Sequence, residues 1–147
     1  MPVGKLAVLP LVLPHEELNR LWRWSALSLP EEACGCLLGQ RSENEVRVER
    51  AFLGVNLERE RPYERFDLDP RSLLHAERSA RAAGQEVVGI WHSHPDGPAL
   101  PSRRDREGAW EAWSYVIVSL AGGPREEAVR AWRLADGVFV EQSLAAL

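Results

Sequence analysis

The sequence contains few cysteines, and their arrangement builds neither a disulfide framework nor a zinc finger. Its 147 residues include only two, Cys34 and Cys36, separated by a single residue. This spacing strains a disulfide within a strand and matches no zinc-finger ligand pattern. We therefore expect both cysteines to be buried as small apolar residues.

Long apolar runs and an excess of basic residues are also missing. No apolar run approaches the roughly 20 residues that cross a bilayer, and residues 1–17 lack the charged segment and cleavage site of a signal peptide. The net charge is -4, and the arginines are interleaved with acidic residues instead of forming the basic face of a nucleic-acid-binding protein. These features predict a cytoplasmic protein with neither membrane nor nucleic acid as a partner.

What the sequence does contain is the composition of an ordinary globular protein, with 45% hydrophobic and 27% charged residues. A chain of this length can bury one core, and no repeat or linker divides it. We expect a single domain over residues 1–147, with the oligomeric state left open. The tryptophans are expected to lie in the core and not to form a stacking platform.

Two helices are predicted from apolar spacing and capping residues. The first covers residues 15–27, where apolar residues at helical spacing form one buried stripe. The second covers residues 70–83, between the helix start at Asp69 and the terminating Gly84. Residues 56–68 lie between the strand predicted at 45–55 and this second helix. They mix charged and aromatic residues without periodicity, which predicts an exposed loop.

The remaining elements are one more helix and a set of strands. A third helix is expected to begin at Ser102 and to carry Trp110 and Trp113 on one side. The predicted strands are 5–13, 33–39, 45–55, 86–91, 114–120, 128–135 and 138–142, the last two joined by an Asp-Gly turn. The fold class is therefore α/β in the mixed α+β sense, a mixed sheet with helices packed on it.

Two histidines and an aspartate have the spacing of a metal site. His92 and His94 are two residues apart at the end of a strand, so both imidazoles project from one face and could bind one ion. Asp105, across a loop rich in proline and glycine, could fold back as a third ligand. Two histidines and one carboxylate leave a fourth position for water, which is typical of catalytic zinc. Zinc lowers the pKa of such a water towards about 7.

A hydrolase also needs a proton acceptor and a group that stabilises the oxyanion. Side chains alternate along the strand 33–39, so Glu32 shares a face with Cys34 and Cys36 and points inward if they do. Glu32 is the best candidate for the general base, because it could lie near the water without being a ligand. Ser102 offers a hydroxyl donor to the oxyanion.

Each part also has a simpler interpretation. A His-x-His pair alone is as consistent with a surface or structural role as with a metal site. Ser102 and Asp105 have the spacing of a capping box, which punctuates helices more often than it takes part in catalysis. Glu32 beside Glu31 would ordinarily be a solvated pair of charges.

The combination resembles the JAMM (MPN+) metallopeptidase motif, Glu…His-x-His-x7-Ser-x-x-Asp. Glu32 is followed by the histidine pair, by seven residues from Pro95 to Pro101, and then by Ser102 and Asp105, so every position is filled. The flanking residues Gly35, Leu37 and Gly89 also match the family's pattern.

The resemblance implies a fold, a cofactor and a role for each motif residue. The implied fold is a curved mixed sheet sandwiched by helices, the JAMM/MPN (cytidine-deaminase-like) architecture. The implied cofactor is one catalytic zinc ion with a bound water. The implied roles are zinc ligand for His92, His94 and Asp105, general base and proton shuttle for Glu32, and oxyanion stabiliser for Ser102.

The short chain looks most like the stand-alone prokaryotic members of that family. This similarity implies a zinc-dependent metallopeptidase that cleaves a peptide or isopeptide bond after the C-terminal Gly-Gly of a ubiquitin-like or sulfur-carrier protein. Residues 56–67 are the candidate for one wall of the substrate groove. Two alternatives stay open, a non-catalytic MPN scaffold and a zinc amidohydrolase acting on small peptides. The residue pattern of a zinc deaminase is absent.

Overall fold

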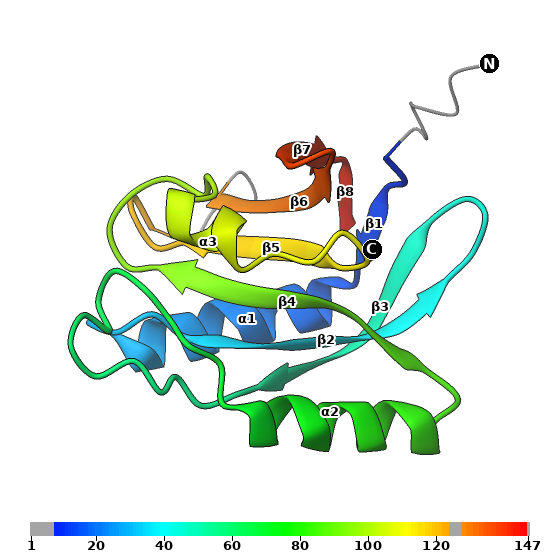
Figure 1. Cartoon of the computed structure of the whole chain (residues 1–147), viewed down its shortest axis with the longest axis horizontal. Helices are drawn as coiled ribbons and strands as arrows, with labels where there is room; N and C mark the ends of the chain where they lie inside the picture. Colours follow the sequence, from blue (N-terminus) through cyan, green and yellow to red (C-terminus); the bar gives the residue numbers. More distant parts are fainter. Residues whose placement is uncertain (1–7, 124–127, 147) are drawn as a thin grey trace.

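The computed structural model describes residues 8–123 and 128–146, within which eight strands form one sheet and three helices occur (Figure 1). The strands are β1 (Leu11–Leu13), β2 (Cys34–Arg41), β3 (Val46–Leu53), β4 (Glu86–His94), β5 (Ser114–Ser119), β6 (Val129–Ala135), β7 (Val138–Gln142) and β8 (Leu144–Ala146). The helices are α1 (His15–Ser28), α2 (Pro70–Ala82) and α3 (Arg103–Glu107). Among the described residues, no helix is both long and apolar enough to cross a membrane.

The sheet is mixed, with the strand order β7-β6-β5-β4-β2-β3-β1-β8. β1 pairs in parallel with β3 and β8, and β4 pairs in parallel with β5. The other neighbours are antiparallel. β4 therefore lies in the middle of the sheet between β2 and β5. This arrangement confirms the predicted α/β class and the curved mixed sheet that the resemblance implied.

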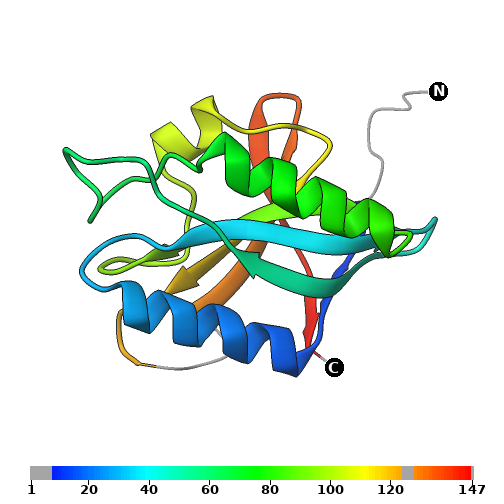
Figure 2. The ribbon, with the colours of Figure 1, turned by 90° about the horizontal axis from the view of Figure 1, so that it is seen from below.

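α1 and α2 lie on opposite faces of the sheet, as Figure 2 shows. On the α1 side, Leu21 packs in an apolar cluster with Leu37 and Trp91 of the sheet. On the α2 side, Ala76 belongs to a second cluster with Ile90. The sheet is thus buried on both faces, which explains why its central strands are apolar without interruption.

The side chains of β2 alternate between the two apolar clusters. Cys36 faces α2 and Leu37 faces α1, as a strand period of two predicts. Cys34 and Cys36 are both buried and free, which confirms their expected role as apolar residues. Burial raises the pKa of both thiols to about 12. Neither cysteine is therefore a thiolate nucleophile at neutral pH.

Gly35 is required by a close approach of its neighbours. A Cβ atom at this position would collide with the carbonyl oxygen of Phe52 on β3 and would also crowd the indole nitrogen of Trp91. That indole nitrogen donates a hydrogen bond to the Phe52 carbonyl at 3.0 Å. Any larger residue at position 35 would separate β2 from β3 at this point.

The ends of α2 follow the predicted capping residues. The Asp69 side chain accepts a hydrogen bond from the backbone nitrogen of Arg71 at 2.9 Å, and Pro70 is the first helical residue. The chain leaves the helix through Gly84, whose φ of 70° is the left-handed conformation that glycine adopts most easily. α2 therefore begins as predicted and ends one residue earlier than expected.

The third helix is shorter than predicted. α3 ends at Glu107, because Gly108 follows as its C-cap and glycine is a poor helix former. Trp110 and Trp113 lie after the helix, with ring centroids 5.0 Å apart, and the backbone nitrogen of Trp110 donates to the Tyr115 hydroxyl. Trp110 is 61% exposed, so the expectation that the tryptophans lie in the core is wrong for this residue.

The two ends of the described chain also differ from expectation. The strand predicted for residues 5–13 begins only at Leu11, because Pro10 cannot donate to a ladder; residues 5–7 lie outside the described residues. β8 was not predicted, because three residues carry too little periodicity to identify a strand. It pairs with β1 and so extends the sheet beyond the N-terminal strand.

Candidate metal centre

The last residues of β4 place two histidines on the face that α2 covers. Cys34 on β2 is the ladder partner of His92. Further back along β4, Val88 is an extra residue without a partner on β2, which makes a β-bulge. After the bulge, Ile90 and His92 share a face, and His94 follows at the same strand period. The buried His92 ring stacks on Phe66, with centroids 4.5 Å apart, so packing fixes its orientation.

The three predicted ligands converge on one point. The Nε2 atoms of His92 and His94 are 3.1 Å apart. Oδ2 of Asp105 lies 3.2 Å from Nε2 of His92 and 3.6 Å from Nε2 of His94. Ligands bound at 2.0 to 2.1 Å around a tetrahedral zinc ion are separated by roughly 3.4 Å. The three atoms therefore have the spacing of one face of such a tetrahedron, and these residues could hold a metal ion.

Hydrogen bonds outside the cluster orient two of the three side chains. Nδ1 of His94 lies 2.7 Å from the carbonyl oxygen of Pro98, which can only accept, so Nδ1 carries the hydrogen and the Nε2 lone pair faces the cluster. Oδ2 of Asp105 accepts a hydrogen bond from the backbone nitrogen of Ser102 at 2.8 Å. The loop 95–101 thus orients His94 through Pro98, and it leads directly to the helix that carries Asp105.

The electrostatics of the cluster favour a charged Asp105 carboxylate beside a neutral His92 and a more readily protonated His94. Burial raises the pKa of Asp105, but hydrogen bonds to both histidines outweigh it and hold this pKa well below its usual range. Burial lowers the pKa of His92. Burial also acts to lower the pKa of His94, but hydrogen bonds to Asp105 and Pro98 raise it overall. Metal binding would therefore displace a proton mainly from His94.

Glu32 lies next to the cluster, just before β2 begins. It is 4% exposed, and its Oε1 atom has no hydrogen-bond partner. Burial raises its pKa to about 8; the charge of His94 lowers it, and the charge of Asp105 raises it further. Glu32 therefore lies within electrostatic range of the predicted ligands without being one of them, in the inward position that strand alternation predicted.

Ser93, between the two histidines, joins β4 to the Glu32 segment. Its hydroxyl accepts a hydrogen bond from the backbone nitrogen of Ala33 at 2.8 Å, and its own backbone nitrogen donates to the Ala33 carbonyl at 3.0 Å. Ser93 was not among the residues predicted from the sequence. The only signal was a small polar residue inside the His-x-His pair, whose partner becomes visible only in the tertiary structure.

Ser102 is the N-cap of α3 and forms a capping box with Asp105. The Ser102 hydroxyl accepts from the backbone nitrogen of Asp105 at 3.0 Å, and the Asp105 carboxylate accepts from the backbone nitrogen of Ser102. The simpler interpretation of this pair is therefore confirmed. It is compatible with a second role, because the exposed Ser102 hydroxyl keeps its hydrogen available for donation.

A cavity of about 530 Å³ opens beside the ligands. Much of its lining is apolar, including Leu73 of α2, Ile90 of β4 and Phe139 of β7, and the predicted ligands His92 and Asp105 line it as well. The cavity is therefore largely apolar and reaches the predicted metal site. Cavities of this composition are typical of ligand-binding sites.

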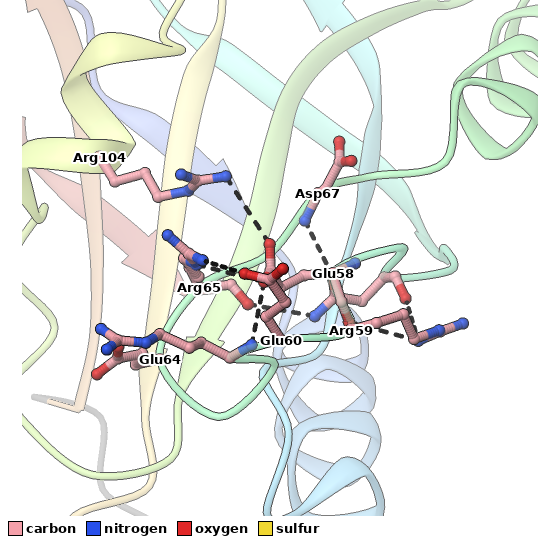
Figure 3. Close-up of polar contacts among 9 residues, drawn as sticks. Glu58, Arg59, Glu60, Glu64, Arg65, Asp67 and Arg104 are labelled. Carbon is pink, nitrogen blue, oxygen red and sulfur yellow. Dashed lines mark hydrogen bonds and ion pairs between the residues drawn. The ribbon is translucent and has the colours of Figure 1, made fainter.

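The loop 56–68 lies beside the cavity and is linked to α3 by charged side chains, as Figure 3 shows. Glu58 forms ion pairs with Arg65 at 3.3 Å and with Arg104 of α3 at 3.9 Å. Phe66 and Asp67 of the loop contribute to the cavity wall. The end of the segment predicted as a groove wall is therefore adjacent to the ligands.

Comparisons with known proteins identify the family of the chain. The family model described as prokaryotic homologs of the JAB domain matches residues 14–135. The chain is 34% identical over 94 residues, 63% of this chain and 66% of the relative, to a desampylase from Haloferax volcanii. It is 31% identical over 142 residues, 97% of this chain and 94% of the relative, to the CysO-cysteine peptidase of Mycobacterium tuberculosis.

A solved structure shares the whole fold. The solution structure of protein DSY2949 from Desulfitobacterium hafniense superimposes with a TM-score of 0.84 and 30% sequence identity, covering 93% of this chain and 92% of that one. Because the family model spans most of the chain and the fold agrees, the resemblance seen in the motif is confirmed. The chain belongs to the prokaryotic homologs of the JAB domain, a prokaryotic branch of the JAMM/MPN family.

Proposed function

We propose that this chain is a zinc-dependent metallopeptidase that hydrolyses a peptide or isopeptide bond after the C-terminal Gly-Gly of a ubiquitin-like or sulfur-carrier protein. The observation that carries the proposal is the convergence of His92, His94 and Asp105 within 3.1 to 3.6 Å, beside a buried carboxylate that is not a ligand. A structural metal site would have four protein ligands and would not need that carboxylate. We also propose that residues 1–147 act as one domain.

The three ligands suit zinc, because two imidazole nitrogens and one carboxylate oxygen are its usual donors at catalytic sites. When bound, the ion supplies Lewis-acid polarisation of the substrate carbonyl and lowers the pKa of a water molecule. His92 and His94 would hold it through ring nitrogens, and Asp105 would hold it through a carboxylate oxygen.

Glu32 handles the proton of the reaction. Its carboxylate takes a proton from the attacking water as the new carbon–oxygen bond forms, and it delivers that proton to the leaving nitrogen as the carbon–nitrogen bond breaks. The Ser102 hydroxyl donates a hydrogen bond to the carbonyl oxygen as negative charge develops on it. A buried carboxylate with a raised pKa is suited to exchanging protons near neutral pH.

The substrate class follows from the relatives and from the shape of the site. One relative is named a desampylase and another a CysO-cysteine peptidase, and we take both names to indicate cleavage of a bond to a small carrier protein. A diglycine is thin enough to pass beside the metal cluster, and the cavity above Leu73 and Phe139 has room for an apolar side chain that precedes it. We infer that the carrier tail runs from this cavity towards His92 and Asp105.

The substitution Glu32→Gln tests the proposal. It should leave zinc bound in a 1:1 ratio, because Glu32 is not a ligand, and should lower kcat by roughly 100-fold or more, the range of general acid–base catalysis. The assay is intact-mass detection of cleavage of Gly-Gly-ending carriers fused to a short extension, with and without a chelator. Unchanged turnover by Glu32→Gln would contradict the role of Glu32.

The same assay separates the two alternatives. A non-catalytic scaffold would bind a carrier tail without cleaving it and would hold no stoichiometric zinc. A small-peptide amidohydrolase would cleave short peptides as readily as the folded carriers. Either result with the wild-type chain would overturn the proposed substrate class.

A further inference from the structure

Asn56 closes the loop that lies beside the site. Its Oδ1 atom accepts hydrogen bonds from the backbone nitrogens of Glu58 and Asp67, each at 2.9 Å. These two residues stand near opposite ends of the loop 56–68. Asn56 is also the bridge partner of Leu68. One side-chain oxygen therefore joins the beginning of the loop to its end.

The amide nitrogen of the same side chain reaches the proposed general base. Nδ2 of Asn56 donates to the carbonyl oxygens of Glu32 at 3.1 Å and Arg65 at 3.4 Å. The backbone nitrogen of Glu32 donates in turn to the Pro62 carbonyl at 2.6 Å. Both backbone polar groups of Glu32 are thus bonded to the loop 56–68.

The next residue is held from the other side. Both backbone groups of Ala33 are bonded to Ser93, which lies between the two histidines of β4. The pair Glu32–Ala33 precedes the first residue of β2, so the sheet ladder does not fix it. Its position is instead set by the loop on one side and by β4 on the other.

The carboxylate itself has little to orient it. Oε1 of Glu32 is buried without a hydrogen-bond partner, so its direction depends on packing and on where the backbone stands. A displacement of about 1 Å at a reacting group can cost on the order of 100-fold in rate. The anchoring of the Glu32 backbone is therefore the point at which a distant residue can influence proton transfer.

We propose that Asn56 is a positioning residue, which joins the closed loop 56–68 to the backbone of Glu32 and so aims its carboxylate at the reaction centre. The inference rests on the proposed function only in assigning proton transfer to Glu32. The anchoring itself is a matter of hydrogen bonds and does not depend on any substrate.

Two substitutions separate the two sides of the Asn56 side chain. Asn56→Ala removes all four hydrogen bonds. Asn56→Asp keeps an acceptor for Glu58 and Asp67, but it presents an oxygen to the carbonyls of Glu32 and Arg65 and so repels them. Asn44→Ala, at an exposed position in the β2–β3 turn, is the matched control.

The first measurement is amide hydrogen exchange by NMR on the whole chain. We expect the Glu32 amide to exchange at least about ten-fold faster in both Asn56 variants than in wild type or Asn44→Ala. In Asn56→Ala its partner Pro62 is released with the opened loop, whereas in Asn56→Asp the new carboxylate repels the Glu32 carbonyl and so moves Glu32 away from Pro62. The Asp67 amide should lose protection in Asn56→Ala alone. Amides of β4 and β5 should stay protected, which shows that the fold persists.

The second measurement is cleavage of a diglycine-ended carrier by the zinc-loaded proteins. We expect kcat to fall by about ten-fold or more in both Asn56 variants, with KM and the zinc ratio unchanged. A Glu32 amide that stays protected in both variants would overturn the proposal, and so would faster exchange with undiminished kcat. Absence of cleavage by the wild type would contradict the proposed function instead, and the exchange data would still decide whether Asn56 anchors Glu32.

Discussion

Glu32 and Asp105 lie beside the same two histidines but carry opposite pKa shifts. Asp105 accepts hydrogen bonds from its neighbours, which hold its pKa low and keep it charged, as its proposed role of metal ligand requires. Glu32 is buried with an unpartnered oxygen, and burial raises its pKa to about 8. This difference in pKa suits the two carboxylates to different proposed roles, Asp105 as metal ligand and Glu32 as proton carrier.

The raised pKa of Glu32 predicts a pH-dependent cost to stability in the metal-free protein. The folded pKa of about 8 lies above the ordinary glutamate value of 4.5, so the folded state binds the extra proton between these pH values and stability falls as pH rises through them. Glu32→Gln should abolish this pH dependence. We expect the variant to gain about 3 kcal/mol in unfolding free energy relative to wild type between pH 5 and pH 8.

Urea unfolding of chelator-treated wild type and Glu32→Gln at both pH values measures this difference. The histidines titrate in both proteins, so their contribution cancels to first order in the comparison. An equal pH dependence in the two proteins would mean that Glu32 is ionised and solvated in the folded chain.

At the scale of elements, β2 and β4 bring the two halves of the site together. Ladder pairing places Cys34 opposite His92, and the bulge at Val88 sets which side of β4 the histidines face. Gly35 lies within this ladder where Phe52 and Trp91 meet. The geometry of the site therefore depends on close packing of strands and not only on the motif residues.

Gly35→Ala should accordingly destabilise the protein. The added methyl group collides with backbone of β3, which cannot move aside as a side-chain end could, so we expect a loss of about 2 kcal/mol or more. Gly108→Ala is the matched control, because a Cβ there meets nothing within 4 Å. Chemical unfolding of both variants checks the prediction, and equal stabilities would contradict it.

α2 supplies a second test at this scale, through the cavity. Leu73→Trp should fill part of the cavity beside the predicted metal site. It should raise KM for a diglycine-ended carrier by about ten-fold, with little change in zinc content. Leu74→Trp is the control, since Leu74 is 45% exposed and does not line the cavity. If KM is the same in both variants as in wild type, the C-terminal tail of the carrier does not occupy this cavity.

At the scale of the whole molecule, the core is built by apolar packing of the sheet against its helices. Each apolar cluster forms between the sheet and one helix, and of the predicted ligands only His92 is fully buried, with its ring stacked on Phe66. The fold therefore does not need the metal for its core. Binding of an ion to the folded state alone still adds stability by mass action.

Chelation should consequently lower the melting temperature without unfolding the protein. With free zinc at 1,000 times its Kd the added stability is about 4 kcal/mol, or roughly 10 °C in Tm for a chain of this size. Circular dichroism with chelator, and again after zinc is restored, measures both effects. His94→Ala should show little zinc-dependent rise, and loss of secondary structure on chelation alone would contradict a core that does not need the metal.

Much of the molecule follows from local sequence. The His-x-His spacing and strand periodicity place both imidazoles on one face, and Asp69 with Gly84 sets the limits of α2. Alternation in β2 also predicts the inward direction of Glu32. These features need only the regular geometry of one strand or one helix, which the order of residues specifies by itself.

The tertiary structure decides whatever depends on residues far apart in the chain. The pKa of Glu32 depends on the burial that several elements create around it, and the contacts of Asn56 with Glu32 and of Ser93 with Ala33 span 24 and 60 residues. The backbone nitrogen of Trp110, just after α3, donates to the Tyr115 hydroxyl at the start of β5, a contact that the spacing of apolar residues does not predict. Desolvation and long-range hydrogen bonds have no periodic signature in the sequence. The sequence therefore identifies the candidate reacting groups, whereas their protonation and orientation depend on the tertiary structure.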